Sequence, residues 1–130
     1  MNVMQFTPAM WVGAGLALVV SIGIIYIGIC YIIAPKAASA GFGFRSEITE
    51  EVAPWQHIKG PRDIVSGLVV LAMLILFGPA AAAVILFVEA LVPIGDGLTI
   101  IRHHGRLRAA IGIHFATAAG MVLAACLLLV

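Results

Sequence analysis

Charged residues are scarce in this chain. Asp, Glu, Lys and Arg make up 10% of its 130 residues, whereas 63% are hydrophobic and the mean hydropathy is +1.18. A soluble domain has about a quarter charged residues, so this chain lacks the side chains that would cover a surface exposed to water. The same composition excludes a disordered chain and a protein that binds nucleic acid, which would need a basic stripe.

Cysteine is also rare, and the familiar cofactor motifs are missing. Cys30 and Cys126 lie far apart in apolar runs and provide neither a disulfide framework nor a metal-ligand spacing. The histidines match no metal-ligand pattern, and the sequence has no Gly-rich phosphate loop or nucleophile elbow. We therefore expect neither a metal nor a cofactor.

Long apolar runs are what the chain has instead. A helix that crosses a bilayer needs about 20 predominantly apolar residues, and the alternation typical of a membrane barrel strand is absent. The sequence predicts an all-α, polytopic membrane protein, a four-transmembrane-helix bundle that forms a single membrane domain over residues 1–130. The expected spans are about 10–34, 61–77, 80–101 and 109–130.

Proline and glycine mark the ends of these spans. Pro35 follows the first run, Pro61 suits the first turn of the second, and Gly78-Pro79 is a turn signal before the third. The first run has no Lys or Arg before it and is longer than a signal-peptide core of about 7–15 residues, so we expect it to be retained as a span. The only long connection is the cytoplasmic loop 35–60, which we expect either to lie on the membrane surface or to cover a site as a lid.

The basic residues lie on one side of the expected membrane. With four spans, the segments 35–60 and 102–108 share a side, while the two termini and the turn at 78–79 share the other. Short basic loops stay in the cytoplasm, so we expect the cell (inner) membrane, with both termini on the non-cytoplasmic side. The residues on the basic side are Lys36, Arg45, Lys59, Arg62, Arg102, Arg106 and Arg108.

Small residues recur at helical spacing in the first and last spans. Such residues let helix backbones approach closely in lipid. We therefore expect close packing here, either inside the bundle or between two copies in a homodimer. The residues are Gly13, Ala17 and Ser21 in the first span, and Gly112, Ala116, Gly120 and Ala124 in the last.

Ionisable residues inside the spans are the strongest functional signal, because charged groups are rare in hydrocarbon and usually face a cavity or a partner. Glu89 lies near the middle of the third span, and Asp96 follows seven residues later. This spacing places both carboxyl groups on one helix face, about 10 Å apart along the axis. Pro93 lies on the same face and removes a backbone hydrogen bond. These residues predict a polar site inside the bundle.

Three further side chains can reach this site. Arg62 and Asp63 open the second span, and His114 lies in the fourth span at a depth similar to that of Asp96. A carboxyl group in apolar surroundings can remain protonated, whereas one beside a guanidinium stays ionised. We expect Glu89 to act as a neutral acid and Asp96 or Asp63 to act as a base. Arg62 would orient these groups, and His114 would either join the site or hydrogen-bond across helices.

Several short motifs resemble a known family. The segment Lys59–Leu68 is similar to the Gly-x-Arg-Asp-x-x-x-Gly segment of a family of small four-helix integral membrane proteins that is catalogued as a domain of unknown function. The spacing of Glu89 and Asp96 is similar too, with glycines on both sides of Asp96 and a basic turn after it, as is Ala34-Pro35 leading into Gly41-Phe42-Gly43.

A more distant likeness connects the chain to membrane-bound hydrolases of fungal polyketide pathways that open polyene epoxides. That likeness implies a lipophilic small molecule as the substrate. It also implies a reacting centre formed by Arg62, Asp63, Glu89 and Asp96.

Three functions fit these observations. The first is an enzyme acting on a lipophilic substrate, for which epoxide opening is the best match because it needs one acid, one base and a pocket closed to bulk solvent. The second is a proton-linked carrier, since intramembrane carboxyl groups also serve proton relays. The third is a partner subunit of a larger membrane complex, in which the carboxyl groups serve assembly alone.

Overall fold

The computed structural model describes residues 6–130, which are all-helical and contain no strand. Residues 1–5, which the sequence analysis assigned to the non-cytoplasmic side, lie outside the described residues. Four helical stretches are long and apolar enough to cross a membrane, and they identify a multi-pass membrane protein. These stretches are Pro8–Ile33, Ala53–Phe77, Pro79–Arg102 and Leu107–Leu128.

Three of the four spanning stretches consist of more than one helical segment. Two pieces, η2 and η3, are π-helical and continue directly from their α-helical neighbours. The order is α1 (Pro8–Ile33), α2 (Pro35–Phe42), α3 (Ala53–Ala72), η2 (Met73–Phe77), α4 (Pro79–Glu89), α5 (Leu91–Arg102), α6 (Leu107–Ala109), η3 (Ala110–Phe115) and α7 (Ala116–Leu128).

The second spanning helix begins earlier than residue 61, which corrects the expected boundary. α3 begins at Ala53 with Pro54 in its first turn, so Pro61 lies inside the helix. A proline there leaves the carbonyl group of His57 without its helical donor. His57 is exposed, so water can satisfy this carbonyl group, and the helix continues through the proline.

The expected loop 35–60 is largely helical, which corrects the second boundary. Ala34 breaks the chain out of α1 with φ −146° and ψ 60°, and Pro35 then opens α2. α3 takes up the end of the same segment, so residues 43–52 are the connection that remains. Pro35 and Pro54 are first-turn residues, and each of them starts a helix here.

The third span is interrupted, as Pro93 predicts. Pro93 has no N–H group, so the carbonyl group of Glu89 lacks a donor four residues later. The interruption falls at Ala90, between α4 and α5. The turn expected before this span is also present, with Gly78 at φ +92°, a backbone conformation that glycine adopts without strain.

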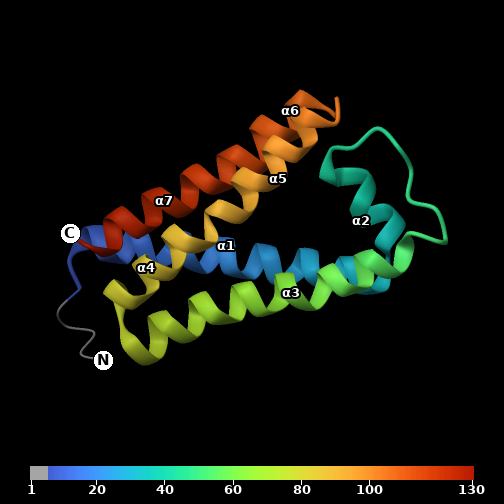
Figure 1. The fold of residues 1–130 in the computed structure, drawn as a ribbon. Helices are drawn as coiled ribbons and strands as arrows, with labels where there is room; N and C mark the ends of the chain where they lie inside the picture. The colour runs from blue at the N-terminus through green and yellow to red at the C-terminus, as the bar shows by residue number, and fades with distance from the viewer. Residues whose placement is uncertain (1–5) are drawn as a thin grey trace.

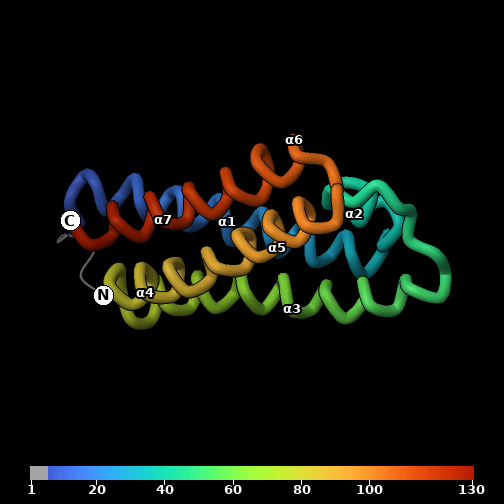
Figure 2. The backbone as a smooth tube through the Cα atoms, turned by 45° about the horizontal axis from the view of Figure 1, so that its top comes forward, coloured from blue at the N-terminus to red at the C-terminus, as the bar shows by residue number. Residues whose placement is uncertain are grey.

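The helices pack tightly at one end of the bundle and diverge at the other. α1 and α3 lie side by side, and α7 packs on α1 and α4 near the C-terminus (Figures 1 and 2). α5 and η3 pack on each other and, with the start of α7, diverge from α1 and α3 toward α2 (Figure 1). The C-terminus lies at the end opposite to α2 and α6, so the basic connections share one end, as expected from the charges.

Glycines allow α1 and α3 to approach each other closely. A Cβ atom built on Gly28 of α1 would lie 2.6 Å from the carbonyl oxygen of Gly60 on α3. One built on Gly67 would lie 2.6 Å from the carbonyl oxygen of Ser21. Helix association in lipid depends on such backbone approach, so these glycines determine the spacing of the pair.

The small residues of the first and last spans behave differently. Gly13 of α1 packs on α7, where an added Cβ would lie 3.0 Å from the carbonyl oxygen of Ala124, and this confirms packing inside the bundle. Gly112 and Ala116 of the last span are exposed instead. The small residues of the last span therefore do not all face the same neighbour.

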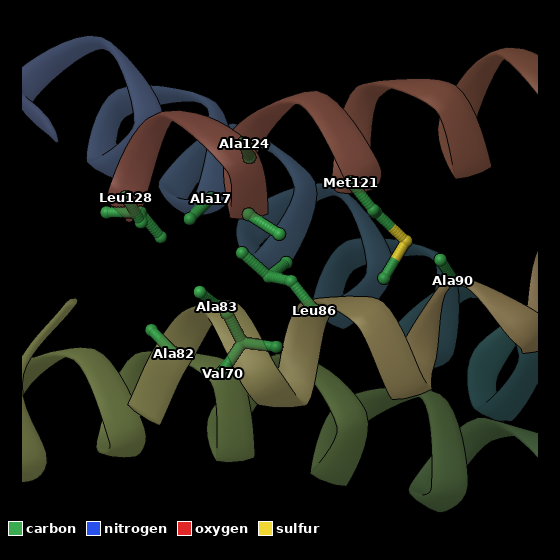
Figure 3. Packing of buried hydrophobic residues seen from close by; sticks show 10 residues of the cluster. Ala17, Val70, Ala82, Ala83, Leu86, Ala90, Met121, Ala124 and Leu128 are labelled. Carbon is green, nitrogen blue, oxygen red and sulfur yellow. The ribbon is translucent and has the colours of Figure 1, made fainter. Parts of the chain in front are cut away.

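An apolar core closes the tightly packed end. α1, α3, α4 and α7 contribute to it (Figure 3), and most of its residues are alanines, which bring the helix backbones close together. Exposed apolar side chains such as Trp11, Ile33 and Phe77 cover the outer surface, as expected where lipid replaces water. The core is formed by Ala17, Val70, Ala82, Ala83, Leu86, Ala90, Met121, Ala124, Ala125 and Leu128.

Candidate functional site

A cavity of about 720 Å³ lies between the diverging helices, on the α2 side of the core. Its lining is mostly apolar and comes from every spanning helix and from α2. Four of the five expected site residues, Asp63, Glu89, Asp96 and His114, line this one cavity, whereas Arg62 does not. The side chains in the lining that carry a hydroxyl, amino, imidazole or carboxyl group are Ser21, Tyr26, Tyr31, Lys59, Asp63, Ser66, Glu89, Asp96, His114 and Thr117.

One face of α3 supplies a polar stripe to the cavity. Lys59, Asp63 and Ser66 follow each other at helical spacing, so all three lie on the same face. Lys59 Nζ donates to Asp63 Oδ2 at 2.5 Å and lies 4.7 Å from the centre of the Tyr31 ring. Asp63 is only 7% exposed. A buried carboxylate needs a partner of opposite charge, and Lys59 provides it.

Arg62 is therefore not the cation of this site, which corrects the expected arrangement. It neighbours Asp63 in sequence, but successive residues of a helix point about 100° apart. The inward position of Asp63 turns Arg62 outward, and the structure leaves Arg62 exposed and outside the cavity lining. The cation lies four residues before Asp63, one helical turn away.

Glu89 connects the third span to α3. Ser66 Oγ donates to Glu89 Oε2 at 2.7 Å, and the Glu89 side chain is half-buried. This bond occupies one carboxyl oxygen, and Oε1 makes no hydrogen bond to any residue within 6–130, so it is available to a proton or a ligand. Pro93 also leaves the backbone carbonyl group of Glu89 without its helical donor. This turn of the helix is therefore unusually polar for a position near the middle of a membrane span.

Asp96 and His114 face each other across the cavity. His114 Nδ1 lies 3.8 Å from Asp96 Oδ2, and His114 is 7% exposed. The other ring nitrogen, Nε2, lies 2.8 Å from the carbonyl oxygen of Phe42. A carbonyl oxygen only accepts hydrogen bonds, so Nε2 carries a hydrogen.

This tautomer determines what His114 presents to Asp96. In neutral His114, Nδ1 then has a lone pair directed toward the carboxyl group, and two lone pairs repel each other. At 3.8 Å the two atoms are too far apart for a direct hydrogen bond, so the Asp96 carboxyl group and the lone pair of His114 both face the cavity.

α2 contributes to the lining at one end of the cavity. Phe42 lines the cavity, and its ring lies edge-on to that of His114 with a centroid distance of 4.7 Å. The N–H group of Arg106 donates to the carbonyl oxygen of Gly43 at 2.7 Å, and the Arg106 side chain donates to that of Ala40. The end of α2 is thus attached to the connection between α5 and α6.

The polar side of α2 and its connection is held by charged residues. Arg45 Nε donates to the carbonyl oxygen of His104 at 3.0 Å. Lys36 pairs with Glu50, and the hydrogen bond and positive charge of Lys36 lower the pKa of this exposed carboxyl group. Because the pair needs an ionised Glu50, it persists at neutral pH and is lost as the pH falls through that lowered pKa.

Sequence reasoning missed Lys59 and Ser66. Lys59 would have been found from its spacing to Asp63 if the helix had been started at Ala53 instead of Pro61, whereas Ser66 already lies inside the expected span, three residues after Asp63. Phe42 belongs to the Gly41-Phe42-Gly43 motif, but its carbonyl contact with His114 depends on tertiary structure. The backbone of α2 gives no local sign of that contact.

Comparisons with other proteins identify a family and no function. Neither the curated proteins nor the solved structures gave a match to this chain. A family described as a domain of unknown function, DUF4267, matches residues 21–129, which include every residue that lines the cavity except Val19 and Val20. The chain belongs to this family of unknown function, DUF4267.

Proposed function

We propose that this protein is a membrane enzyme that opens an epoxide on a lipophilic substrate by acid–base chemistry. The observation that supports it most is that Asp63, Glu89 and Asp96 converge on one largely apolar cavity. Ionisable groups inside a membrane are costly and usually functional. A concave apolar pocket with a few convergent polar groups is the usual form of a small-molecule site.

The three carboxyl groups have different roles in this proposal. Lys59 neutralises Asp63, and this ion pair orients the polar face of α3. Asp96 is the base, because its carboxyl group borders the cavity and lies 3.8 Å from His114 Nδ1. Glu89 is the acid, with Oε1 holding the proton while Oε2 accepts the bond from Ser66.

The reaction needs one water molecule. Asp96 takes a proton from the water as the water oxygen attacks an epoxide carbon. The carbon–oxygen bond of the ring breaks, its electron pair goes to the ring oxygen, and this oxygen takes a proton from Glu89. The product is a vicinal diol, and return of the proton from Asp96 to Glu89 restores the site. An acid and a base are sufficient for this step.

The test is turnover of a lipophilic epoxide by the purified chain in lipid nanodiscs. Isotope-labelled water should place one labelled oxygen in the diol. Glu89→Gln should lower turnover by at least about tenfold. The loss should be smaller than the loss caused by removing the acid completely, because the glutamine amide still donates a hydrogen bond to the ring oxygen. Glu47→Gln in the exposed connection is the matched control and should retain full turnover. Equal turnover in both variants would exclude Glu89 as the acid.

A proton-linked carrier is the second candidate, because intramembrane carboxyl groups also relay protons. The alanine-rich core closes the half of the bundle beyond Glu89, which favours the enzyme. Proton flux into liposomes that depends on Glu89 would favour the carrier. Normal activity of a co-purifying membrane enzyme after Asp96→Asn would favour a partner subunit.

We also place the α2 end of the bundle on the cytoplasmic side of the cell (inner) membrane. All Lys and Arg residues belong to this end, and short basic loops stay in the cytoplasm. A reporter enzyme that is active only outside the cytoplasm should be active when fused after Val130 and inactive when inserted between Ser46 and Glu47. The opposite pattern would invert the assigned orientation.

A further inference from the structure

The cavity reaches the lipid-facing surface between α1 and α7. Val19 and Tyr26 of α1 line the cavity although they are 69% and 66% exposed. Ile113 of η3 and Thr117 of α7 also line it and are exposed. A residue that is both exposed and part of the lining lies at the rim, so one stretch of the rim follows α1 on one side and η3 and α7 on the other. Gly41 of α2 and Val92 of α5 mark other exposed parts of the rim.

Two glycines, one on each side of this rim, leave gaps between its side chains. Gly23 of α1 and Gly120 of α7 both line the cavity, and a Cβ atom added to either would have no neighbour within 4 Å. They differ from Gly28, where an added Cβ would meet backbone atoms. Helix packing therefore does not require glycine at 23 or 120, but a side chain there would enter the opening.

The two glycines lie at different depths, about 9 Å apart along the gap between α1 and α7. The contact between Gly13 and Ala124 marks where α1 and α7 still touch. Gly23 lies about 15 Å further along α1 and Gly120 about 6 Å further along α7, both in the direction of α2. The helices separate over this stretch, near the middle of the bundle.

A buried polar atom inside the opening points to an occupant. Ser21 Oγ is fully buried, lines the cavity and has no hydrogen-bond partner among the described residues. A buried hydroxyl group without a hydrogen-bond partner destabilises the folded protein. A ligand with an oxygen atom in the cavity would provide that partner.

We propose that a single-chain amphiphile from the bilayer enters the cavity sideways between α1 and α7. Its polar end lies among Ser21, Glu89 and Asp96, and its apolar chain leaves through the gap beside Gly23 and Gly120. An aliphatic chain can remain in lipid while its polar end reacts, so the substrate need not cross water. The reaction of this amphiphile depends on the proposed function, whereas its binding does not.

The test uses a long-chain fatty alcohol with a mid-chain diazirine, photolysed with the full chain in nanodiscs. Adducts mapped by mass spectrometry should fall on 19–30 of α1 and on 113–120. Gly23→Leu and Gly120→Leu should each lower this labelling about tenfold, equivalent to about 1.4 kcal/mol of binding. Gly15→Leu and Gly112→Leu are matched controls, because both positions have open space and lie outside the lining; they should label as the wild type does.

A second variant keeps the proposal testable if a leucine disturbs the fold. Ser21→Ala removes only the hydroxyl group, so it should weaken labelling by the fatty alcohol and leave labelling by the corresponding diazirine alkane unchanged. Unchanged alcohol labelling in Ser21→Ala would contradict the role of this hydroxyl group.

Three outcomes would overturn the side entrance. They are wild-type labelling in both rim leucine variants, adducts centred on Val92 that indicate entry between α3 and α5, and crosslinks between two copies that indicate a homodimer in the gap. Labelling and turnover are measured separately on the same wild-type sample, so that binding is distinguished from chemistry. Labelling with no turnover by the wild type would reject the proposed function and leave the entrance in place.

Discussion

Replacing Asp96 with asparagine is expected to lower epoxide turnover by about 10²–10⁴-fold, the usual contribution of a positioned acid or base. Asparagine has almost the same shape, but its amide does not take a proton from water. The expected change is in kcat, because the apolar walls that bind the substrate are unaltered. Steady-state kinetics in nanodiscs measure it, with KM close to that of the wild type.

The control for this prediction must show that the site is intact. Asp96→Asn should keep the wild-type thermal unfolding midpoint, since Asp96 is partly exposed and His114 is held independently by the carbonyl oxygen of Phe42. Asp96→Glu keeps a carboxyl group and should recover part of the lost rate. Full turnover in Asp96→Asn would move the base to another residue and remove the main support for the mechanism.

Replacing Gly28 with alanine is expected to destabilise the bundle by about 1–3 kcal/mol, the usual cost of overpacking a close contact. The new Cβ would lie 2.6 Å from the carbonyl oxygen of Gly60 and 2.9 Å from the backbone nitrogen of Ile64. Backbone atoms of a helix have no other rotamer to adopt, so α1 and α3 must separate. Thermal unfolding in nanodiscs should show a lower midpoint.

Two further alanine variants make this result specific. Gly15→Ala places a methyl group in open space and should be neutral or stabilising by at most about 1 kcal/mol, because alanine is the better helix former. Gly67→Ala would meet the carbonyl oxygen of Ser21 and should behave like Gly28→Ala. A wild-type unfolding midpoint for both Gly28→Ala and Gly67→Ala would show that a methyl group fits between α1 and α3, and would contradict the close approach of these helices.

The start of the second span shows where sequence patterns become ambiguous. Pro54 and Pro61 are both acceptable first-turn residues, and a hydropathy pattern favours the one that adjoins the apolar run. α3 begins at Ala53, with the earlier proline, Pro54, in its first turn. Its first turns lie outside the apolar run, so water can bond to the exposed carbonyl group of His57 that Pro61 leaves without a donor. The start of the helix also decides which basic residue is expected to pair with Asp63. If the helix begins at Pro61, Arg62 is the expected partner of Asp63, whereas a helix from Ala53 places Lys59 one turn before Asp63.

The sequence by itself determined that the chain is an all-helical membrane protein with four spans, and that Asp63, Glu89, Asp96 and His114 are its unusual residues. These conclusions depend on composition and short-range spacing, which hold in any packing of the helices. Only the tertiary structure decided that these side chains share a cavity, that Lys59 is the cation and that α2 contributes to the lining at one end. The contacts responsible join residues as distant as Phe42 and His114, and such contacts depend on how far the helices diverge rather than on any local pattern.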